Sequence, residues 1–197
     1  MMFFAIYTNV NITEKQDWLD GFRSKYDLEY HADTDTFYVP YDAHITLTQP
    51  RFIIDSETAL LKTELTKFFD NYSGKIEIEF SGLHLDRQDT NDNGCIMVDS
   101  TNSDELSKLQ SKMLNFVRKN DNFCDIMHKA YEDDFIPHLT IWRDLSKIRF
   151  DKAISELPDK IQIKATVSEV ILAVVRDESA AERKDPKNLT VYRITNN

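Results

Sequence analysis

Alternating apolar and polar residues predict most of the strands in this chain. Two strands are predicted around His44 and His138. Because successive side chains of a strand point to opposite faces, each strand would turn one apolar face toward a core. The other predicted strands lie at residues 3–10, 75–86, 94–100, 161–177 and 189–195.

Apolar residues at helical spacing predict four helices between these strands. The first begins at a capping box made by Thr13 and Gln16, whose side chains can satisfy free amides of the first turn. The predicted helices run from Thr13 to about Lys25, from Ser56 to about Phe69, from Ser103 to near Asn120 and from Asp151 to about Leu157. Their expected apolar stripes are Trp18, Leu19 and Phe22; Leu60, Leu61, Leu65 and Phe68; and Leu106, Leu109, Met113, Leu114 and Val117.

The order of these elements indicates an α+β fold with two roughly similar halves. At 197 residues the chain is long enough to bury a sizeable core, and we expect residues 1–197 to form a single bilobal domain. Residues 27–42 show no period and are predicted to be a loop. Residues 176–188 are rich in charge and are predicted to be a solvated hairpin loop.

Two passages of the chain are almost alike, DAHITLTQP at 42–50 and IPHLTIWRD at 136–144. In each, a histidine and a threonine two residues later share one face of the strand: His44 with Thr46, continued by Thr48, and His138 with Thr140. A single histidine on a half-buried strand is usually structural. Two copies, each followed by a predicted helix, favour two halves of one active site.

Two imidazoles on opposite sides of phosphorus suit the in-line displacement of a phosphodiester. One takes a proton from the attacking oxygen and the other gives a proton to the leaving oxygen, both at neutral pH. Threonine hydroxyls on the same faces can hydrogen-bond the non-bridging oxygens. We therefore expect no metal and no cofactor in the reaction.

The paired motif resembles that of the two-histidine (2H) phosphoesterase superfamily, which includes LigT-like RNA 2'-5' ligases and cyclic nucleotide phosphodiesterases. The matching residues are HIT at 44–46 followed by Leu47, and PHLT at 137–140 followed by Ile141 and Arg143. One departure is Ala43, where a proline often precedes the first histidine. It leaves the motif itself intact.

The resemblance implies an α+β, bilobal, pseudo-twofold fold, with antiparallel sheets flanking a central cleft and helices on the outside. It implies that His44 and His138 are the acid and base pair, and that Thr46 and Thr140 hold the phosphate. The substrates of the family include 2',3'-cyclic phosphates, 2'-5' linkages, ADP-ribose cyclic phosphates and oligoadenylates. Which histidine is the acid depends on the orientation of the substrate, and the sequence leaves both assignments open.

Four more residues are candidates for substrate binding. Trp142 has the strand parity of the second motif and could stack on a base, or it could pack at the rim of the cleft. Arg143 has the opposite parity, so a phosphate contact requires a bulge, and a structural ion pair is the alternative. Tyr38 and Tyr41, together with Phe37, precede the first motif and could hold a base or ribose, or simply anchor the loop.

The remaining histidines and the nearest arginine have simpler interpretations. Arg51 follows the first motif and could raise the local positive potential, or form a surface salt bridge. The three histidines outside the motifs are expected to be structural or to face solvent: His31, His84 and His128.

Residues 89–94 match the first half of an EF-hand calcium loop, but the second half does not match. Residues 89–94 supply Asp89, Asn91, Asn93 and Gly94, but Ser100 stands where a bidentate glutamate is needed. The segment is expected to be a hairpin turn between two strands. His44 and His138 as metal ligands lack a carboxylate set nearby, so no metal is expected there.

The formal net charge of −10 and the pI of about 4.9 make it unfavourable for the chain to bind a long nucleic-acid duplex along its phosphate backbone. A small nucleotide or an RNA end remains a suitable partner, because one cleft can be locally positive. The N-terminus lacks a basic region typical of a signal peptide, no apolar run is long enough for a membrane span, and Cys95 and Cys124 are expected to be reduced thiols. We expect a cytoplasmic monomer.

The leading hypothesis is a metal-independent phosphodiesterase that opens 2',3'-cyclic phosphates or cuts 2'-5' bonds. The second is a nucleotide- or RNA-binding module that keeps the cleft and does little chemistry. The third is an α+β protein in which the two similar strands are a coincidence.

Overall fold

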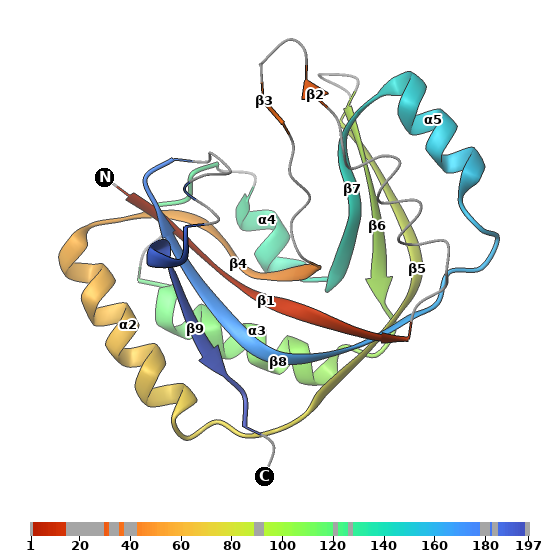
Figure 1. The fold of residues 1–197 in the computed structure, drawn as a ribbon. Coiled ribbons are helices and arrows are strands. Elements are labelled where there is room, and N and C mark those ends of the chain that lie inside the picture. The colour runs from red at the N-terminus through yellow and green to blue at the C-terminus, as the bar shows by residue number, and fades with distance from the viewer. Residues whose placement is uncertain are drawn as a thin grey trace.

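A large antiparallel sheet forms the centre of the molecule. The structure is a computed structural model, and it describes residues 2–14, 30–31, 36–37, 43–88, 93–119, 122–125, 128–177, 182 and 185–195. Its seven strands pair in the order β4-β1-β8-β5-β6-β7, and β9 pairs with β8 (Figure 1). The predicted α+β class with antiparallel pairing is confirmed. The strands are β1 (Met2–Glu14), β4 (His44–Ile53), β5 (Ile76–Gln88), β6 (Asn93–Ser100), β7 (His138–Ser146), β8 (Ile163–Val175) and β9 (Leu189–Arg193).

The long strands β1 and β8 run through both halves of the sheet. One edge of β8 pairs with β1 from Val175 to Lys164. Its other edge is divided, because residues 169–173 pair with β9 and residues 163–167 pair with β5. The two halves therefore share one continuous backbone hydrogen-bond network instead of meeting only through side chains.

The two strands that carry the histidine motifs lie at opposite ends of the pairing order. Even so, β4 and β7 are in contact with each other. The twist of the sheet carries its ends out of a common plane, and Figure 1 shows the sheet curving from β4 around to β7. Curvature, and not direct pairing between the described residues of β4 and β7, brings the two strands that carry the motifs into contact.

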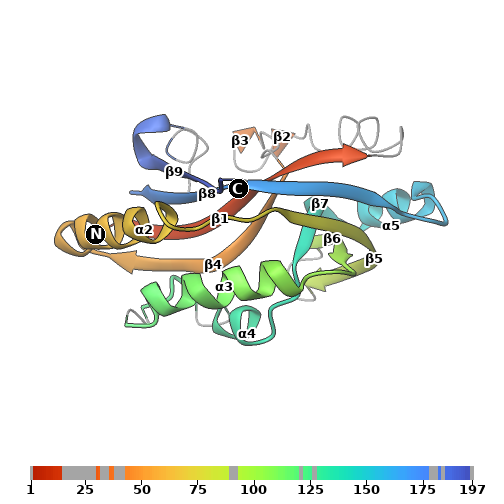
Figure 2. The ribbon, with the colours of Figure 1, turned by 90° about the horizontal axis from the view of Figure 1, so that it is seen from below.

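Helices cover the sheet and contact particular strands. Helix α2 contacts β9, α3 and α4 contact β4, and α5 contacts β6 and β7. Figure 2 shows α3 and α4 on one side of the sheet and the two-stranded pair β2–β3 on the other. No helix in the described ranges is long and apolar enough to cross a membrane. The bounds are α2 (Asp55–Phe69), α3 (Asp104–Val117), α4 (His128–Asp133), α5 (Lys147–Glu156), the 3-10 turn η1 (Pro186–Asn188), β2 (Tyr30–His31) and β3 (Thr36–Phe37).

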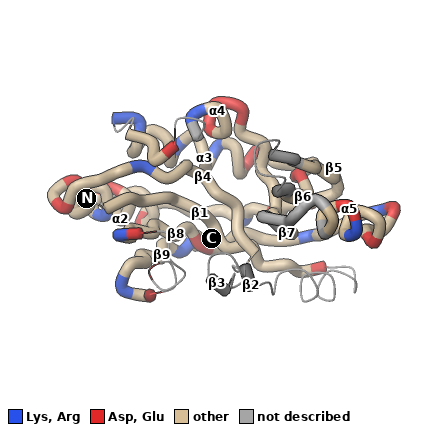
Figure 3. The backbone as a smooth tube through the Cα atoms, turned by 90° about the horizontal axis from the view of Figure 1, so that it is seen from above, with Lys and Arg blue, Asp and Glu red and all other residues tan. Residues whose placement is uncertain are grey.

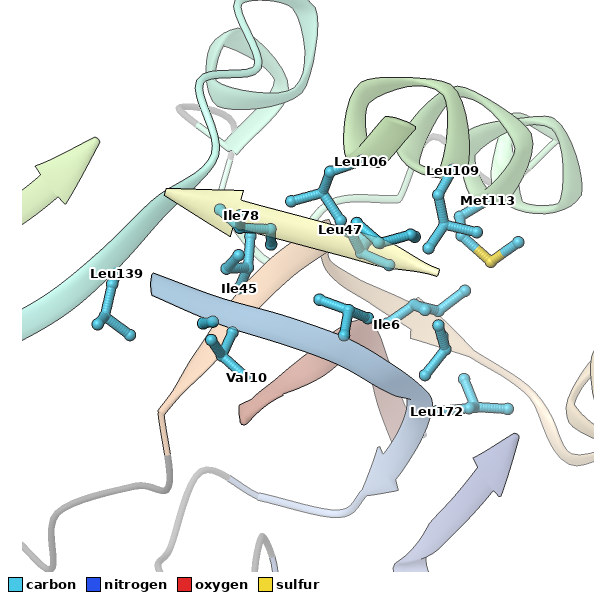
Figure 4. Packing of buried hydrophobic residues seen from close by; sticks show 14 of the residues in the cluster. Ile6, Val10, Ile45, Leu47, Ile78, Leu106, Leu109, Met113, Leu139 and Leu172 are labelled. Atoms are coloured by element: carbon cyan, nitrogen blue, oxygen red, sulfur yellow. The ribbon is translucent and has the colours of Figure 1, made fainter. Parts of the chain in front are cut away.

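The main core lies between α3 and the sheet. Leu106, Leu109 and Met113 of α3 are fully buried and, with Ile6 of β1 and Leu47 of β4, belong to one hydrophobic cluster (Figure 4). Burying a side chain of this size contributes about 1.5–3 kcal/mol to folding. The apolar faces of the motif strands thus fix which of their residues remain on the other face.

The helix boundaries differ from the sequence prediction in three places. Helix α2 begins at Asp55, with Ile54 as its N-cap, so Ser56 is not the cap. Leu60 is exposed because the core stripe follows Leu61, Leu65 and Phe69, and one residue along a helix turns the side chain by about 100°. Helix α5 begins at Lys147 rather than Asp151, and the short helix α4 was not expected.

Two predictions concern residues 13–42. Strand β1 continues to Glu14, so Thr13 lies in a strand and does not begin a helix. Most of the predicted helix, residues 15–25, lies outside the described residues. Within the predicted loop the structure describes the two-residue strands β2 and β3, which pair with each other.

A bulge in β4 changes the face on which Thr48 lies. The register with β1 shifts between Tyr7↔Thr46 and Ile6↔Thr48, so one extra residue of β4 is inserted there. Thr48 therefore points into the core, fully buried, and its hydroxyl accepts a hydrogen bond from the Ile6 amide at 3.1 Å. The expectation that Thr48 shares the face of His44 and Thr46 is wrong.

We predict that Thr48→Val lowers the free energy of unfolding by about 1–3 kcal/mol, because the buried Ile6 amide loses its acceptor while the side-chain shape is kept. Urea denaturation measures the change. Thr63→Val, at an exposed position of α2, is the matched control and should stay within about 0.5 kcal/mol of the wild type. Equal effects of the two substitutions would contradict the bulge.

Candidate active site

The first motif lies at the start of β4, where alternation holds as predicted. Ile45 and Leu47 are buried in the core, whereas His44 and Thr46 are partly exposed on the opposite face. On the neighbouring strand β1, Asn9 lies opposite His44 and Tyr7 lies opposite Thr46. Because cross-strand partners share a face, these four residues form one patch of the sheet surface.

Tyr7 belongs to this patch and was missed by the sequence prediction. Its ring lies edge-on to the imidazole of His44, with ring centroids 5.5 Å apart and planes at 68°. Tyr7 alternates with the buried Ile6 and Thr8, so the sequence placed it on the face opposite the core. The pairing of β1 with β4, which brings it to His44, is a long-range contact that the alternation alone does not specify.

The second motif lies at the start of β7. Leu139 and Ile141 are buried, and His138 and Thr140 are partly exposed on the other face. The Nδ1 atom of His138 lies 3.0 Å from the backbone oxygen of Ile136. Since a carbonyl can only accept, Nδ1 carries a proton and Nε2 is the ring nitrogen left for chemistry.

The face of the second motif continues across β6 and β5. Asp99 lies opposite His138, and Gly82 lies opposite Asp99 on the next strand. Nδ1 of His84 lies 3.5 Å from Oδ1 of Asp99. This distance is short enough for an ion pair, but the two atoms do not form a hydrogen bond. His84 was expected to be structural or to face solvent; it is about half exposed and shares the face of the second motif.

A bulge also interrupts β7 beyond Thr140. Thr140 pairs with Met97, but Trp142 then pairs with Ile96, so the register shifts between them. This bulge is what a phosphate contact by Arg143 requires. It also places Trp142 opposite the buried Ile96, so the expectation that Trp142 keeps the strand parity of His138 and Thr140 is wrong. The structure describes the backbone of Trp142 and Arg143 and not their side chains.

Other predicted residues are described in part or not at all. Tyr38 and Tyr41 lie outside the described residues, and only the backbone is described for Phe37, His31 and His128. The hairpin expected at residues 89–94 is flanked by strands, with Gln88 paired to Asn93. Within the described ranges no three His, Cys, Asp or Glu residues are grouped so that they could hold a metal ion.

Arg51 occupies neither of the two positions that were expected for it. Its side chain is 2% exposed, and its guanidinium binds the carboxylate of Glu132 at 2.6 and 2.5 Å. It lies opposite Phe4 of β1, on the core side of the sheet. It is therefore a buried and neutralised cation, not a surface salt bridge or a source of positive potential at the motif.

Among the described residues, the charged side chains belong mainly to helices and loops (Figure 3). Figure 3 shows that the central strands β1 and β8 are largely uncharged, whereas acidic residues gather at α4. The strand β1, which pairs with the strand of the first motif, therefore adds little charge to the surroundings of that motif.

The two motifs have equivalent places in the fold. His44 is the first residue of β4 and His138 is the first residue of β7, and the two strands are in contact. Each histidine is followed by a threonine on the same face and by apolar residues in the core. Two imidazoles and two hydroxyls carried by contacting strands are suited to proton transfer on both sides of a phosphoryl group.

Comparison with known proteins gives one family and several structures. A family model described as the 2'-5' RNA ligase superfamily matches residues 14–178. No curated protein sequence matches the chain. The solved structures with a similar fold share few identical residues with it, so their likeness concerns the fold alone.

Two of these structures are of Usb1 from Kluyveromyces marxianus. The first is 9% identical, with a TM-score of 0.52, and the match covers 98% of each chain. The second, with uridine monophosphate, is 8% identical, with a TM-score of 0.51, and the match covers 96% of this chain and 99% of that one. A structure described as a phosphoesterase is 10% identical, with a TM-score of 0.50 and coverage of 99% and 96%.

We predict that Tyr7→Leu moves the ring-proton resonances of His44 and lowers the free energy of unfolding, because an edge-to-face ring pair contributes about 0.5–1.5 kcal/mol beyond its buried area. Proton NMR and urea denaturation measure the two effects. Tyr7→Phe keeps the ring and is the control. Unchanged His44 resonances in Tyr7→Leu would show that the rings do not touch in solution.

Proposed function

Because the chain belongs to the 2'-5' RNA ligase superfamily, we propose that it is a metal-independent phosphodiesterase acting on RNA ends or small nucleotides. The bonds concerned are 2',3'-cyclic phosphates or 2'-5' phosphodiesters. The observation that carries the proposal is the contact between two strands that each begin with a histidine followed by a threonine on the same face.

In the proposed reaction, water attacks phosphorus in line with the ribose oxygen that leaves. One imidazole, of His44 or His138, takes the proton from the water, and the other gives a proton to the leaving oxygen. The hydroxyls of Thr46 and Thr140 donate hydrogen bonds to the non-bridging oxygens as negative charge builds on them. His138 acts through Nε2, since its Nδ1 proton is held by Ile136.

The proposed substrate is small or is recognised at one end. A net charge of −10 opposes contact with a long polyanion, while the similar fold of Usb1 has been solved with uridine monophosphate. In this proposal Tyr38 and Tyr41 contact the base or ribose, and Arg143 contacts the phosphate. The bulge at Thr140–Trp142 supports the last assignment.

A nucleotide- or RNA-binding module with little catalysis is the alternative function. For such a module the acidity of the whole chain favours a small nucleotide over RNA as the ligand, because avid capture of RNA is opposed. The two complete histidine and threonine pairs count against it, since binding alone needs no acid and base. Binding that survives the loss of both imidazoles, without turnover by the intact protein, would establish this alternative.

We predict that the protein hydrolyses 2',3'-cyclic nucleotides or 2'-5' dinucleotides in the presence of EDTA, and that His44→Ala and His138→Ala each lower the rate about 10²- to 10⁴-fold. Thr46→Ala and Thr140→Ala should also lower it, whereas Thr63→Ala, on an exposed face of α2, should not. Product formation is followed by chromatography, with 3'-5' dinucleotides alongside. Full activity in either histidine variant would contradict the proposal.

We predict a bell-shaped dependence of kcat/KM on pH, because one imidazole must be neutral and the other protonated in the free enzyme. The double variant His44→Ala/His138→Ala should lose far less than the product of the two single losses, since the groups act as a unit. Initial rates from pH 5 to 9 test the first expectation. A flat profile over that range would exclude paired acid and base catalysis.

A further inference from the structure

One buried ion pair joins the helix before the second motif to the strand of the first. Glu132 of α4 and Arg51 of β4 are 8% and 2% exposed. The Oε1 atom of Glu132 accepts hydrogen bonds from Nη1 of Arg51 and from the amide of Gln49, each at 2.6 Å. Its Oε2 atom accepts from Nη2 of Arg51 at 2.5 Å. Three donors thus converge on one buried carboxylate.

The surroundings of the pair are ordered by further contacts. Nη1 of Arg51 also donates to the backbone oxygen of Gln49 at 3.0 Å, and the guanidinium lies 4.1 Å from the ring centroid of Phe123. Backbone bonds from Cys124 to Pro50 at 3.0 Å and from Phe52 to Asn122 at 2.8 Å attach the connection between α3 and α4 to β4. The chain that leads to the second motif is thereby fastened to the strand of the first.

The position of the pair along the chain relates it to both motifs. Gln49 is the fifth residue after His44, and Glu132 is the sixth residue before His138. No ladder joins the described residues of β4 and β7, so backbone pairing between them does not set their spacing. The Arg51–Glu132 pair therefore joins two short chain segments, residues 44–51 and 132–138, by hydrogen bonds. Each segment ends at a motif histidine.

Stability alone does not account for an ion pair at this place. Removing two charges from water offsets most of their mutual attraction, and well-packed apolar residues of similar volume often serve as well or better. Arg51 lies on the core side of β4, opposite Phe4, where an apolar residue would suit the surroundings. What an apolar pair cannot supply is the directed hydrogen bonding to both the amide and the oxygen of Gln49.

We propose that Arg51 and Glu132 are positioning residues that set the spacing and orientation of the two motif histidines. The proposal rests on the proposed function, because those histidines are taken as the acid and base. The pair touches no substrate. It acts by holding α4, and hence the entry of the chain into β7, at a fixed place on β4.

The test is the double variant Arg51→Met/Glu132→Leu, which keeps the volume and removes the directed bonds. We expect a folded protein by circular dichroism, with kcat at least tenfold lower and KM changed less than threefold. The matched control is Lys108→Met/Glu105→Leu, which removes an ion pair between exposed residues of α3 and should leave both constants unchanged. A double variant with kcat within twofold of the wild type would overturn the proposal.

A second variant covers the case in which the double variant does not fold. Arg51→Lys keeps one charge but cannot span both carboxylate oxygens as the guanidinium does. The same selective loss of kcat is expected, at least threefold. A folded Arg51→Lys protein with the kcat of the wild type would equally overturn the proposal.

A readout without catalysis separates this proposal from the proposed function. If the wild type turns over none of the substrates, the proposed function fails. The positioning role is then read from ring ¹⁵N spectra of His138, whose Nδ1 proton faces Ile136, four residues from Glu132. Altered His138 signals in the variants, with unaltered signals in the control, support the role, and unaltered signals in all of them overturn it.

Discussion

The antiparallel ladder between β1 and β8 is the interaction on which the rest of the structure depends. It runs from Phe3↔Val175 to Glu14↔Lys164, and every other strand of the large sheet attaches directly or indirectly to one of its two outer edges. On one side β1 carries β4. On the other, β8 carries β9 with one half of its length and β5 with the other half. The two motif strands therefore have fixed places relative to a single backbone network.

The curvature of the sheet and the bulges in β4 and β7 shape the candidate active site. The sheet curves until its two end strands touch, which no planar sheet of this order would allow. The first register shift in β4 turns Thr48 inward, while His44 and Thr46 before it stay on the outer face; beyond a second shift, Arg51 also points inward. One strand thus presents polar chemistry at its start and a buried ion pair near its end. Regular alternation would have left Thr48 on the outer face.

Local patterns in the sequence were sufficient for most elements and for the motif faces. Alternation placed Ile45 and Leu47 in the core and His44 and Thr46 opposite, as the structure has them. Features that depend on distant partners were not predictable in this way. The contact of Tyr7 with His44, the burial of Arg51 against Glu132, and the short helix α4 all arise from strand order and tertiary packing. A bulge, too, leaves no periodic signal.

The attachment of residues 122–124 to β4 has a consequence for association between molecules. An end strand offers free amides and carbonyls to any other extended chain, and long open edges are sites of aggregation. Here Pro50 and Phe52 already bond to Cys124 and Asn122, and the amide of Gln49 bonds to Glu132. This stretch of edge is closed from within the same chain. A foreign strand could add to it only by first displacing the segment that leads into the second motif.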